Sequence, residues 1–142
     1  MTLDGLALAA LIIVLFNMLY FQISSPSFLL VSLEIPTVTI LLRGQFWYHF
    51  SILGVTTALA TLAFAISGHL VVAAEIAAIS AYAIFVRGWF RGRMDTELAA
   101  RDGADRQAVR RLRRLHWVGM LSHGVALAVL LGSIPYMNLF SA

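Results

Sequence analysis

Long apolar runs alternate with short polar stretches along the chain, and the length of each run decides the predicted element. Four runs are about as long as the roughly 20 residues that an α-helix needs to cross the hydrocarbon of a membrane. They lie at residues 5–23, 46–67, 70–87 and 115–135. We therefore predict an all-α fold, a bundle of four transmembrane helices, with residues 1–142 forming a single integral membrane domain.

The polar positions between the runs define the connections. Only Ser67, Gly68 and His69 separate the second and third runs, which predicts a tight turn and an antiparallel helical hairpin. After the first run, Pro36 interrupts a shorter apolar stretch, and a proline inside a helix breaks it. We predict that residues 24–42 form a short interfacial or re-entrant element rather than a crossing.

Charged positions are few, and most of them lie in one segment. Charged residues make up 12% of the chain, about half of the roughly 25% in an average soluble domain, whereas 61% of the residues are hydrophobic. All ten basic residues are arginine, and all but Arg43 lie between residues 87 and 114. Short Arg-rich loops stay on the cytoplasmic side of a membrane. We therefore expect a multi-pass protein of the bacterial inner membrane with segment 88–114 in the cytoplasm and the C-terminus in the periplasm.

Part of this cytoplasmic segment has the pattern of an amphipathic helix. Asp105 is a candidate N-cap, and after it apolar residues recur at helical spacing opposite a basic face. We predict a cytoplasmic extension that continues into the fourth membrane helix. Its arginines can contact anionic lipid headgroups, or they can act only as the topology signal. These arginines are Arg106, Arg110, Arg113 and Arg114.

Small residues predict which membrane helices approach closely, because lipid provides no hydrophobic drive between helices. The third run aligns Ala73, Ala77 and Ala81, and the second and fourth runs also carry Gly, Ala, Ser and Thr. We expect these three helices to pack tightly. The first run is bulkier, so we expect its helix at the periphery of the bundle.

Ionisable side chains near or within the runs are the candidates for function, because a charge in hydrocarbon is costly. The chain has no cysteine and no lysine, so histidine and carboxylate carry most of the available chemistry. We place His49, His116 and Glu34 at the same cytoplasmic boundary. There they can form a metal site, a polar pocket for a quinone or acyl substrate, or a proton path. The alternative is that both histidines are interfacial and bind water or headgroups.

His123 lies about two turns deeper in the fourth run, and two interpretations stay open for it. It can be an axial ligand to haem or a chlorin, although bis-histidine ligation needs a second deep histidine on another helix. By this placement, no other histidine is deep. It can instead bond to a polar residue of another helix, such as Thr56, Thr57, Asn17 or Glu75.

Two other polar side chains interrupt the apolar runs, Asn17 in the first and Glu75 in the third. Glu75 can pair with His69 at the turn, or it can form a hydrogen bond between helices in its protonated form. Both are candidate intramembrane polar contacts.

Short stretches near the second and fourth runs carry a resemblance to a known group. These stretches are Leu41–Phe46, Arg113–His116 and Met120–His123. In them the chain resembles small four-helix bacterial membrane proteins, a group that includes anthrone-oxygenase-like proteins. The resemblance implies that His116, in a Leu-His pair at the entrance of the last helix, is the residue to carry over.

The sequence contains no Ser-His-Asp set, phosphate loop or carboxylate pair, which favours a role other than catalysis. We expect an accessory, structural or assembly subunit that packs against a larger membrane complex or against itself, within the lipid bilayer and without nucleic acid. The alternative is a small membrane oxidoreductase, or a protein that binds a cofactor or lipophilic ligand through His49, His116 and His123. Its cofactor would be haem, a chlorin or a histidine-bound metal. A small transporter is a third possibility.

Overall fold

Four long helices make up most of the fold, in a computed structural model that describes residues 2–103 and 105–136. In chain order the elements are α1 (Leu3–Ser24), the 3-10 helix η1 (Ser25–Leu29), α2 (Pro36–Ile66), α3 (Leu70–Asp102), α4 (Ala108–Ser133) and the 3-10 helix η2 (Ile134–Tyr136). All four α-helices are long and apolar enough to cross a membrane. The predicted all-α class and the four long apolar helices are confirmed.

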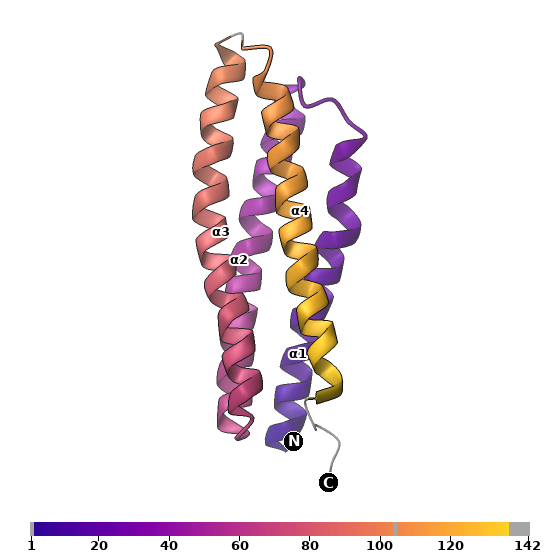
Figure 1. The fold of residues 1–142 in the computed structure, drawn as a ribbon, viewed down its shortest axis with the longest axis vertical. Helices are drawn as coiled ribbons and strands as arrows, with labels where there is room; N and C mark the ends of the chain where they lie inside the picture. The colour runs from indigo at the N-terminus through magenta and orange to yellow at the C-terminus, as the bar shows by residue number, and fades with distance from the viewer. Residues whose placement is uncertain (1, 104, 137–142) are drawn as a thin grey trace.

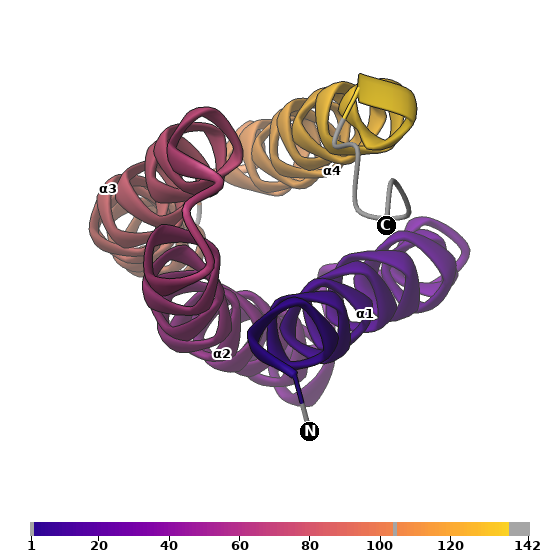
Figure 2. The ribbon, with the colours of Figure 1, turned by 90° about the horizontal axis from the view of Figure 1, so that it is seen from below.

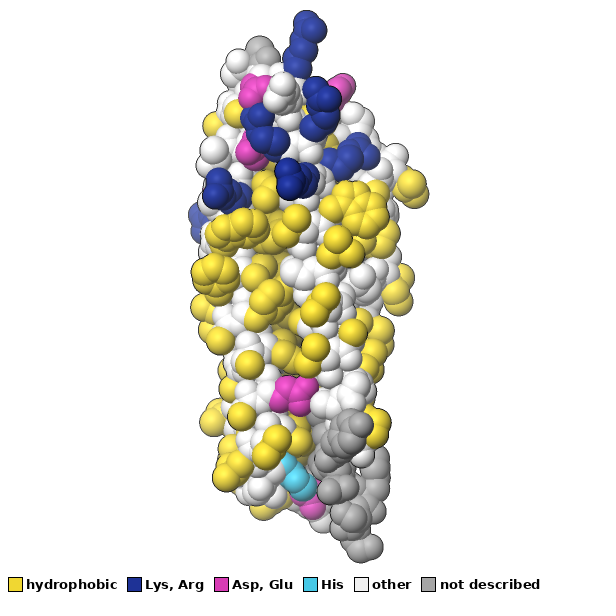
Figure 3. Space-filling view, in the orientation of Figure 1, with side chains coloured by type: hydrophobic (Ala, Val, Ile, Leu, Met, Phe, Trp, Pro, Cys, Tyr) yellow, Lys and Arg dark blue, Asp and Glu magenta, His cyan; other side chains and the backbone are white. Residues whose placement is uncertain are grey.

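The four helices stand side by side in chain order around a common axis (Figures 1 and 2). Each packs against the next, and α4 closes the ring against α1. The end of α3 and the start of α4 lie at one end of the bundle, while the start of α1 and the end of α4 lie at the other. Figure 3 shows basic side chains gathered at the first end, above a broad apolar band.

The start of α2 differs from the prediction, because this helix begins at Pro36 and not near residue 46. Proline suits the first turn of a helix, where its missing N–H would have no partner in any case. Ile35 before it has an extended backbone, and Pro36 therefore starts a helix instead of breaking one. The separate element predicted over residues 24–42 reduces to η1, a loop and the beginning of α2.

The end of α3 also differs, because the helix continues to Asp102 and not only to residue 87. Segment 88–114 is therefore mostly helical, with a short turn between α3 and α4. The predicted helix that leads without a break into the fourth apolar run is confirmed and begins at Ala108. Gln107, and not Asp105, is its N-cap residue; the Asp105 carboxylate instead accepts a hydrogen bond from the Gln107 N–H at 2.8 Å.

The turn between α2 and α3 is as tight as predicted. Gly68 has a φ of +85°, in the left-handed region that glycine adopts without a steric penalty. The N–H of His69 donates to the carbonyl of Phe64 at 2.9 Å, which closes the end of α2. The antiparallel hairpin of α2 and α3 is confirmed.

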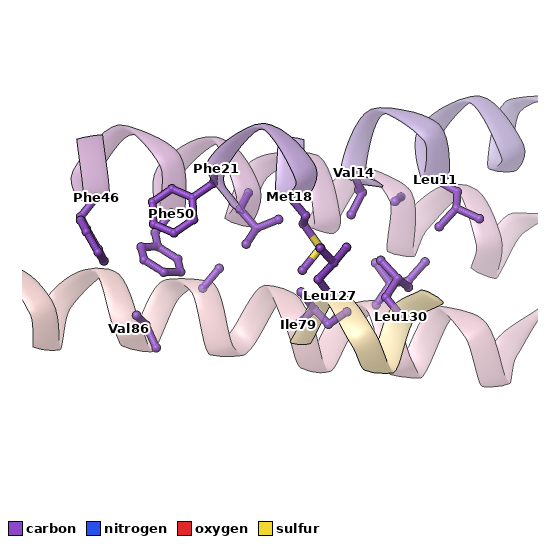
Figure 4. Close-up of a cluster of buried hydrophobic side chains, with 14 of the residues drawn as sticks. Leu11, Val14, Met18, Phe21, Phe46, Phe50, Ile79, Val86, Leu127 and Leu130 are labelled. Atoms are coloured by element: carbon purple, nitrogen blue, oxygen red, sulfur yellow. The ribbon is translucent and has the colours of Figure 1, made fainter. Parts of the chain in front are cut away.

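The core is a column of apolar side chains to which all four helices contribute. In Figure 4, Phe21 of α1 lies against Phe46 and Phe50 of α2, and Met18 lies close to Leu127 of α4. The α1 contribution is a stripe at helical spacing: Ala7, Leu11, Val14, Met18 and Phe21. The first helix is the least buried of the four, as expected, but one face of it belongs to the core.

Small residues bring helices together at two specific points. On α2, the carbonyl of Gly54 accepts a hydrogen bond from the Ser80 hydroxyl of α3 at 3.2 Å. On α4, Gly119 faces the rings of Phe46 and Phe90, which stack with centroids 4.9 Å apart. A Cβ atom at Gly119 would lie 2.6 Å from Cζ of Phe90, so α4 can approach the two rings only where a side chain is missing.

Candidate functional site

Two histidines from different helices meet inside the bundle. The rings of His49 on α2 and His123 on α4 make an edge-to-face contact, with centroids 4.7 Å apart and planes at 85°. His49 is 7% exposed and His123 is fully buried. His49 lies more than three turns inside α2, and not three residues in as predicted, because the helix begins at Pro36. His49 and His123 are therefore two buried histidines in direct contact.

Aromatic rings hold this pair in place. Phe21 of α1 stacks on His49 with centroids 4.0 Å apart, and it meets His123 edge to face at 4.9 Å. Phe50, one residue after His49, meets both imidazoles edge to face. Its ring centroid lies 5.1 Å from that of His49 and 6.1 Å from that of His123. Both imidazoles therefore lie in apolar surroundings that restrict their orientation.

A hydrogen bond to α1 determines the protonation pattern of His123. Its Nε2 lies 3.1 Å from the carbonyl oxygen of Met18, and a carbonyl can only accept. Nε2 therefore carries the proton, and Nδ1 of the neutral ring is an acceptor. This contact replaces the four side-chain partners considered for His123: Thr56, Thr57, Asn17 and Glu75.

Each ring of the pair also carries a nitrogen without a hydrogen-bond partner among the described residues. Nδ1 of His123 and Nε2 of His49 are both buried and unpaired among the described residues. Buried polar atoms are paired in the great majority of cases. Two unpaired nitrogens in adjacent rings therefore mark this cluster as the candidate site.

His49 also lines a groove of about 320 Å³ between α1 and α2 on the outside of the bundle. The groove walls are mostly aromatic or aliphatic: Ile13, Phe16, Tyr20, Phe21, Tyr48 and Ile52. Asn17, Gln45 and Thr56 add polar atoms. Oε1 of Gln45 is, like Nε2 of His49, buried and unpaired among the described residues, while the Gln45 amide donates to the Ser24 hydroxyl at 3.0 Å. The groove therefore combines apolar walls with two unpaired polar atoms.

His116 does not belong to this pair. Its Nε2 lies 2.9 Å from the Ser25 hydroxyl, at the junction of α1 and η1, and its ring meets Phe46 edge to face at 5.7 Å. The side chain is fully buried. This contact links α4 to η1, while Nδ1 of His116 is, like the nitrogens of the pair, buried and without a partner among the described residues.

The metal site predicted from His49, His116 and Glu34 is not formed. Glu34 is exposed in the loop before α2, whereas the two histidines are buried in different contacts. Within residues 2–103 and 105–136, no group of three His, Cys, Asp or Glu side chains is placed to hold a metal ion. A haem or chlorin between His49 and His123 does not fit either, because rings in direct contact leave no room for a macrocycle between them.

The remaining polar positions lie apart from the pair. His69 meets Asp4 of α1, with Nε2 3.2 Å from Oδ1, so the predicted pairing of His69 with Glu75 is wrong. Glu75 is half-buried, and its Oε1 has no partner in the described part of the chain. Asn17 is half-buried and lines the groove.

The four arginines predicted at the headgroups divide into two kinds. Arg106, Arg110 and Arg114 are exposed. Arg113 instead donates from Nη1 to the carbonyl of Leu29 at 2.9 Å, which ties η1 to α4. No pattern in the sequence indicates this contact, because the contact depends on η1 lying against α4.

Two further residues of structural importance were missed from the sequence. Arg101 of α3 donates from Nη1 to the Thr39 hydroxyl at 2.7 Å, which fixes the beginning of α2. Phe21 forms one wall of the histidine pair. Its place on the apolar stripe of α1 marks it as a core residue, but nothing in the stripe indicates which rings it contacts.

Comparisons of the chain with protein-family models, curated proteins and solved structures found no match. The resemblance to small four-helix bacterial membrane proteins therefore stays a prediction.

The pair of rings and the groove together define what this site can do. A neutral imidazole offers one donor and one acceptor. His49 can therefore bind a hydroxyl or carbonyl group, and it is the histidine of the pair that lines the groove. The arrangement suits recognition of one polar group on an otherwise apolar molecule.

Proposed function

We propose that this is a multi-pass membrane protein that binds a lipid-soluble molecule with a polar head in the groove between α1 and α2. The observation that carries the proposal is His49, a buried histidine that lines a mostly apolar groove and whose Nε2 has no hydrogen-bond partner among the described residues. A buried polar atom without a partner costs roughly 1–3 kcal/mol. A ligand hydroxyl or carbonyl would remove that cost.

The walls of the groove favour a ligand whose polar head is a flat aromatic ring. Phe16, Tyr20, Phe21 and Tyr48 line it, and aromatic rings gain from offset or edge contacts with one another. A hydroxyl group both donates and accepts, so it suits the unpaired nitrogen of His49 in either tautomer. A hydroxyaromatic compound of the quinol or phenol class meets both requirements.

We further infer that α1–α4 cross a bacterial inner membrane, with the Arg-rich end in the cytoplasm and the C-terminus in the periplasm. Large apolar side chains are exposed on all four helices, which suits contact with lipid. The basic side chains gather at one end of the bundle (Figure 3), in line with the positive-inside rule. The loop from η1 to Pro36 lies at this same end and would be interfacial.

A role as an accessory or assembly subunit of a larger complex, or as a self-associating one, stays a prediction. An exposed apolar surface suits lipid and a membrane partner equally, so the surface does not favour one over the other. Purification in a mild detergent tests the role: a partner recovered in fixed stoichiometry would support it, and a lone monomer would contradict it.

Equilibrium dialysis tests ligand binding. The purified protein in detergent would be titrated with a decyl-substituted hydroquinone, with detergent alone as background. We expect saturable binding that is at least tenfold weaker in His49→Phe, which keeps a ring against Phe21 but removes both nitrogens. Ile13→Trp, which fills the groove, should weaken binding as well.

His69→Phe is the matched control, because it makes the same change in a histidine at the far end of the bundle. Its affinity should equal that of the wild type. Unchanged binding in His49→Phe, or an equal loss in His69→Phe, would contradict the proposal.

A further inference from the structure

A second cavity lies between α2 and α3, near the Arg-rich end of the bundle, and it shares Tyr48 with the groove at His49. It has a volume of about 350 Å³ and is lined by three arginines, Arg43 from α2 and Arg87 and Arg91 from α3. Its apolar lining includes Phe90 and Met94. No other cavity or side-chain cluster that we found in residues 2–103 and 105–136 combines free positive charge with a shaped recess.

One tryptophan orients two of these arginines. The guanidinium carbon of Arg87 lies 3.9 Å from the centroid of the Trp47 ring, and that of Arg91 lies 4.8 Å from it. A guanidinium over an aromatic face is held by the ring and keeps its N–H groups free to donate. The two long side chains are therefore partly ordered before any ligand arrives.

The charges in the cavity are only partly neutralised. Arg43 forms a two-pronged contact with Asp95, with N–O distances of 2.5 and 3.1 Å, and Arg91 lies 3.9 Å from the same carboxylate. Arg87 has no carboxylate partner in the described part of the chain. Three guanidinium groups thus face one carboxylate, which leaves a surplus of two positive charges (3 − 1).

The position of the cavity indicates where its ligand comes from. Arg87 is the first charged residue after the apolar run of α3, and Trp47 is of the residue type that settles at headgroup depth. At the rim, Ile40 and Tyr48 are 64% and 68% exposed, so apolar contacts continue from the cavity to the outside of the bundle. Phosphate groups suit the planar donors of arginine, and basic pockets between membrane helices bind anionic lipid headgroups.

We propose that this cavity binds the phosphate of an anionic phospholipid, with Arg87 and Arg91 as donors, Trp47 as the platform that holds them, and Arg43 fixed at the edge by Asp95. The site is distinct from the arginines predicted at the headgroups from the sequence and from the groove at His49. None of its three arginines lines that groove, so the proposal does not rest on ligand binding at His49.

Native mass spectrometry of the purified protein tests the site. The protein would be incubated with phosphatidylglycerol or with phosphatidylcholine, and the retained lipid would be counted. We expect the wild type to retain phosphatidylglycerol in preference to phosphatidylcholine. The double variant Arg87→Gln/Arg91→Gln should retain at least fivefold less phosphatidylglycerol.

The matched control is Arg106→Gln/Arg110→Gln, which removes the same charge from two exposed arginines at the same end of the bundle. Because these exposed arginines are candidates for diffuse contact with headgroups, we expect a small loss of phosphatidylglycerol, well below that of Arg87→Gln/Arg91→Gln. An equal loss in both double variants would show diffuse attraction and overturn the proposal, as would equal retention of the two lipids by the wild type.

Two further arms complete the test. Inorganic phosphate at millimolar concentration should not displace phosphatidylglycerol; if it binds and competes, a soluble phosphate is the ligand and the lipid assignment is wrong. If the double variant does not fold, Arg87→Gln alone provides the comparison, because removing Arg87 leaves no carboxylate unpaired. Undiminished retention in a folded Arg87→Gln would overturn the proposal.

Discussion

The carbonyl of Met18 on α1 accepts a hydrogen bond from Nε2 of His123 on α4, across 105 positions of sequence. The contact joins the first and last long helices and closes the ring of the bundle. It also leaves Nδ1 of His123 as an acceptor that is buried and without a partner among the described residues. One interaction therefore serves both the fold and the geometry of the candidate site.

Replacement of His123 by leucine removes this hydrogen bond while keeping an apolar side chain of useful size. Hydrogen bonds between helices in membrane proteins contribute about 0.6 kcal/mol on average and up to about 1.7 kcal/mol. We expect His123→Leu to lower the free energy of unfolding by roughly 1 kcal/mol, measured by denaturant titration in mixed micelles. His69→Leu, at the exposed end of the bundle, should change it much less; equal losses would contradict the role given to His123.

Gly119 provides a steric test of how α4 packs. An alanine there would place its Cβ 2.6 Å from Phe90 and also against Phe46, whose rings already stack on one another. We expect Gly119→Ala to destabilise the protein by about 1–3 kcal/mol, the usual cost of overpacking a core. Gly132→Ala on the same helix meets open space and should be neutral or stabilising by up to about 1 kcal/mol. Thermal unfolding of the two variants in one detergent compares them, and similar midpoints would contradict this packing.

Local features of the chain were predictable, and the turn at Gly68 is the clearest case. The connection has only three residues and one of them is glycine, so adjacent positions in the sequence are enough to predict it. The extension of α3 was missed for a physical reason: arginines such as Arg91 and Arg93 end the apolar pattern, but arginine is a good helix former and does not end the helix. Pro36 was ambiguous because proline can either start or break a helix.

The error at Pro36 carried over into the candidate site. A later start for α2 placed His49 near the beginning of the helix, beside His116, whereas in the structure it lies more than three turns inside α2, against His123. That His49 faces His123, and not His116, depends on how far each helix is rotated about its axis. Such a rotation is fixed by contacts between helices, for example at Phe21, and periodicity within one helix does not reveal it.

The turn before α4 should respond to pH. Hydrogen bonds from the Arg111 side chain and from the Gln107 N–H lower the pKa of Asp105 below its ordinary value of 3.8. A lowered pKa in the folded state means that the ion pair stabilises the turn above the ordinary value and is lost as pH falls through the lowered one. Hydrogen exchange at Gln107 and Ala108, corrected for the intrinsic rate, should therefore show less protection near pH 3 than at pH 6.

Asp105→Asn is the control for that experiment. Because it cannot ionise, its exchange at these amides should already be faster at pH 6 and should change little between the two values. A wild-type pH response that persists in Asp105→Asn would assign the effect to another group, such as Glu97, which also contacts Arg111.

Arg113 and Arg114 allow a matched test of how η1 is held. Arg113 donates to the carbonyl of Leu29, whereas Arg114 is exposed and makes no hydrogen bond within the described residues. Hydrogen bonds that involve a charged group contribute about 1.5–3 kcal/mol when well formed, and less where water competes. We expect Arg113→Gln to speed hydrogen exchange of η1 amides about five- to tenfold, and Arg114→Gln, with the same loss of charge, to leave it unchanged. Ser25→Ala, which removes the contact between Ser25 and His116, should add to the effect of Arg113→Gln because the two links join η1 to α4 at separate points. Equal exchange in the two arginine variants would mean that the charge of this end of the bundle, and not the bond to Leu29, holds η1 in place.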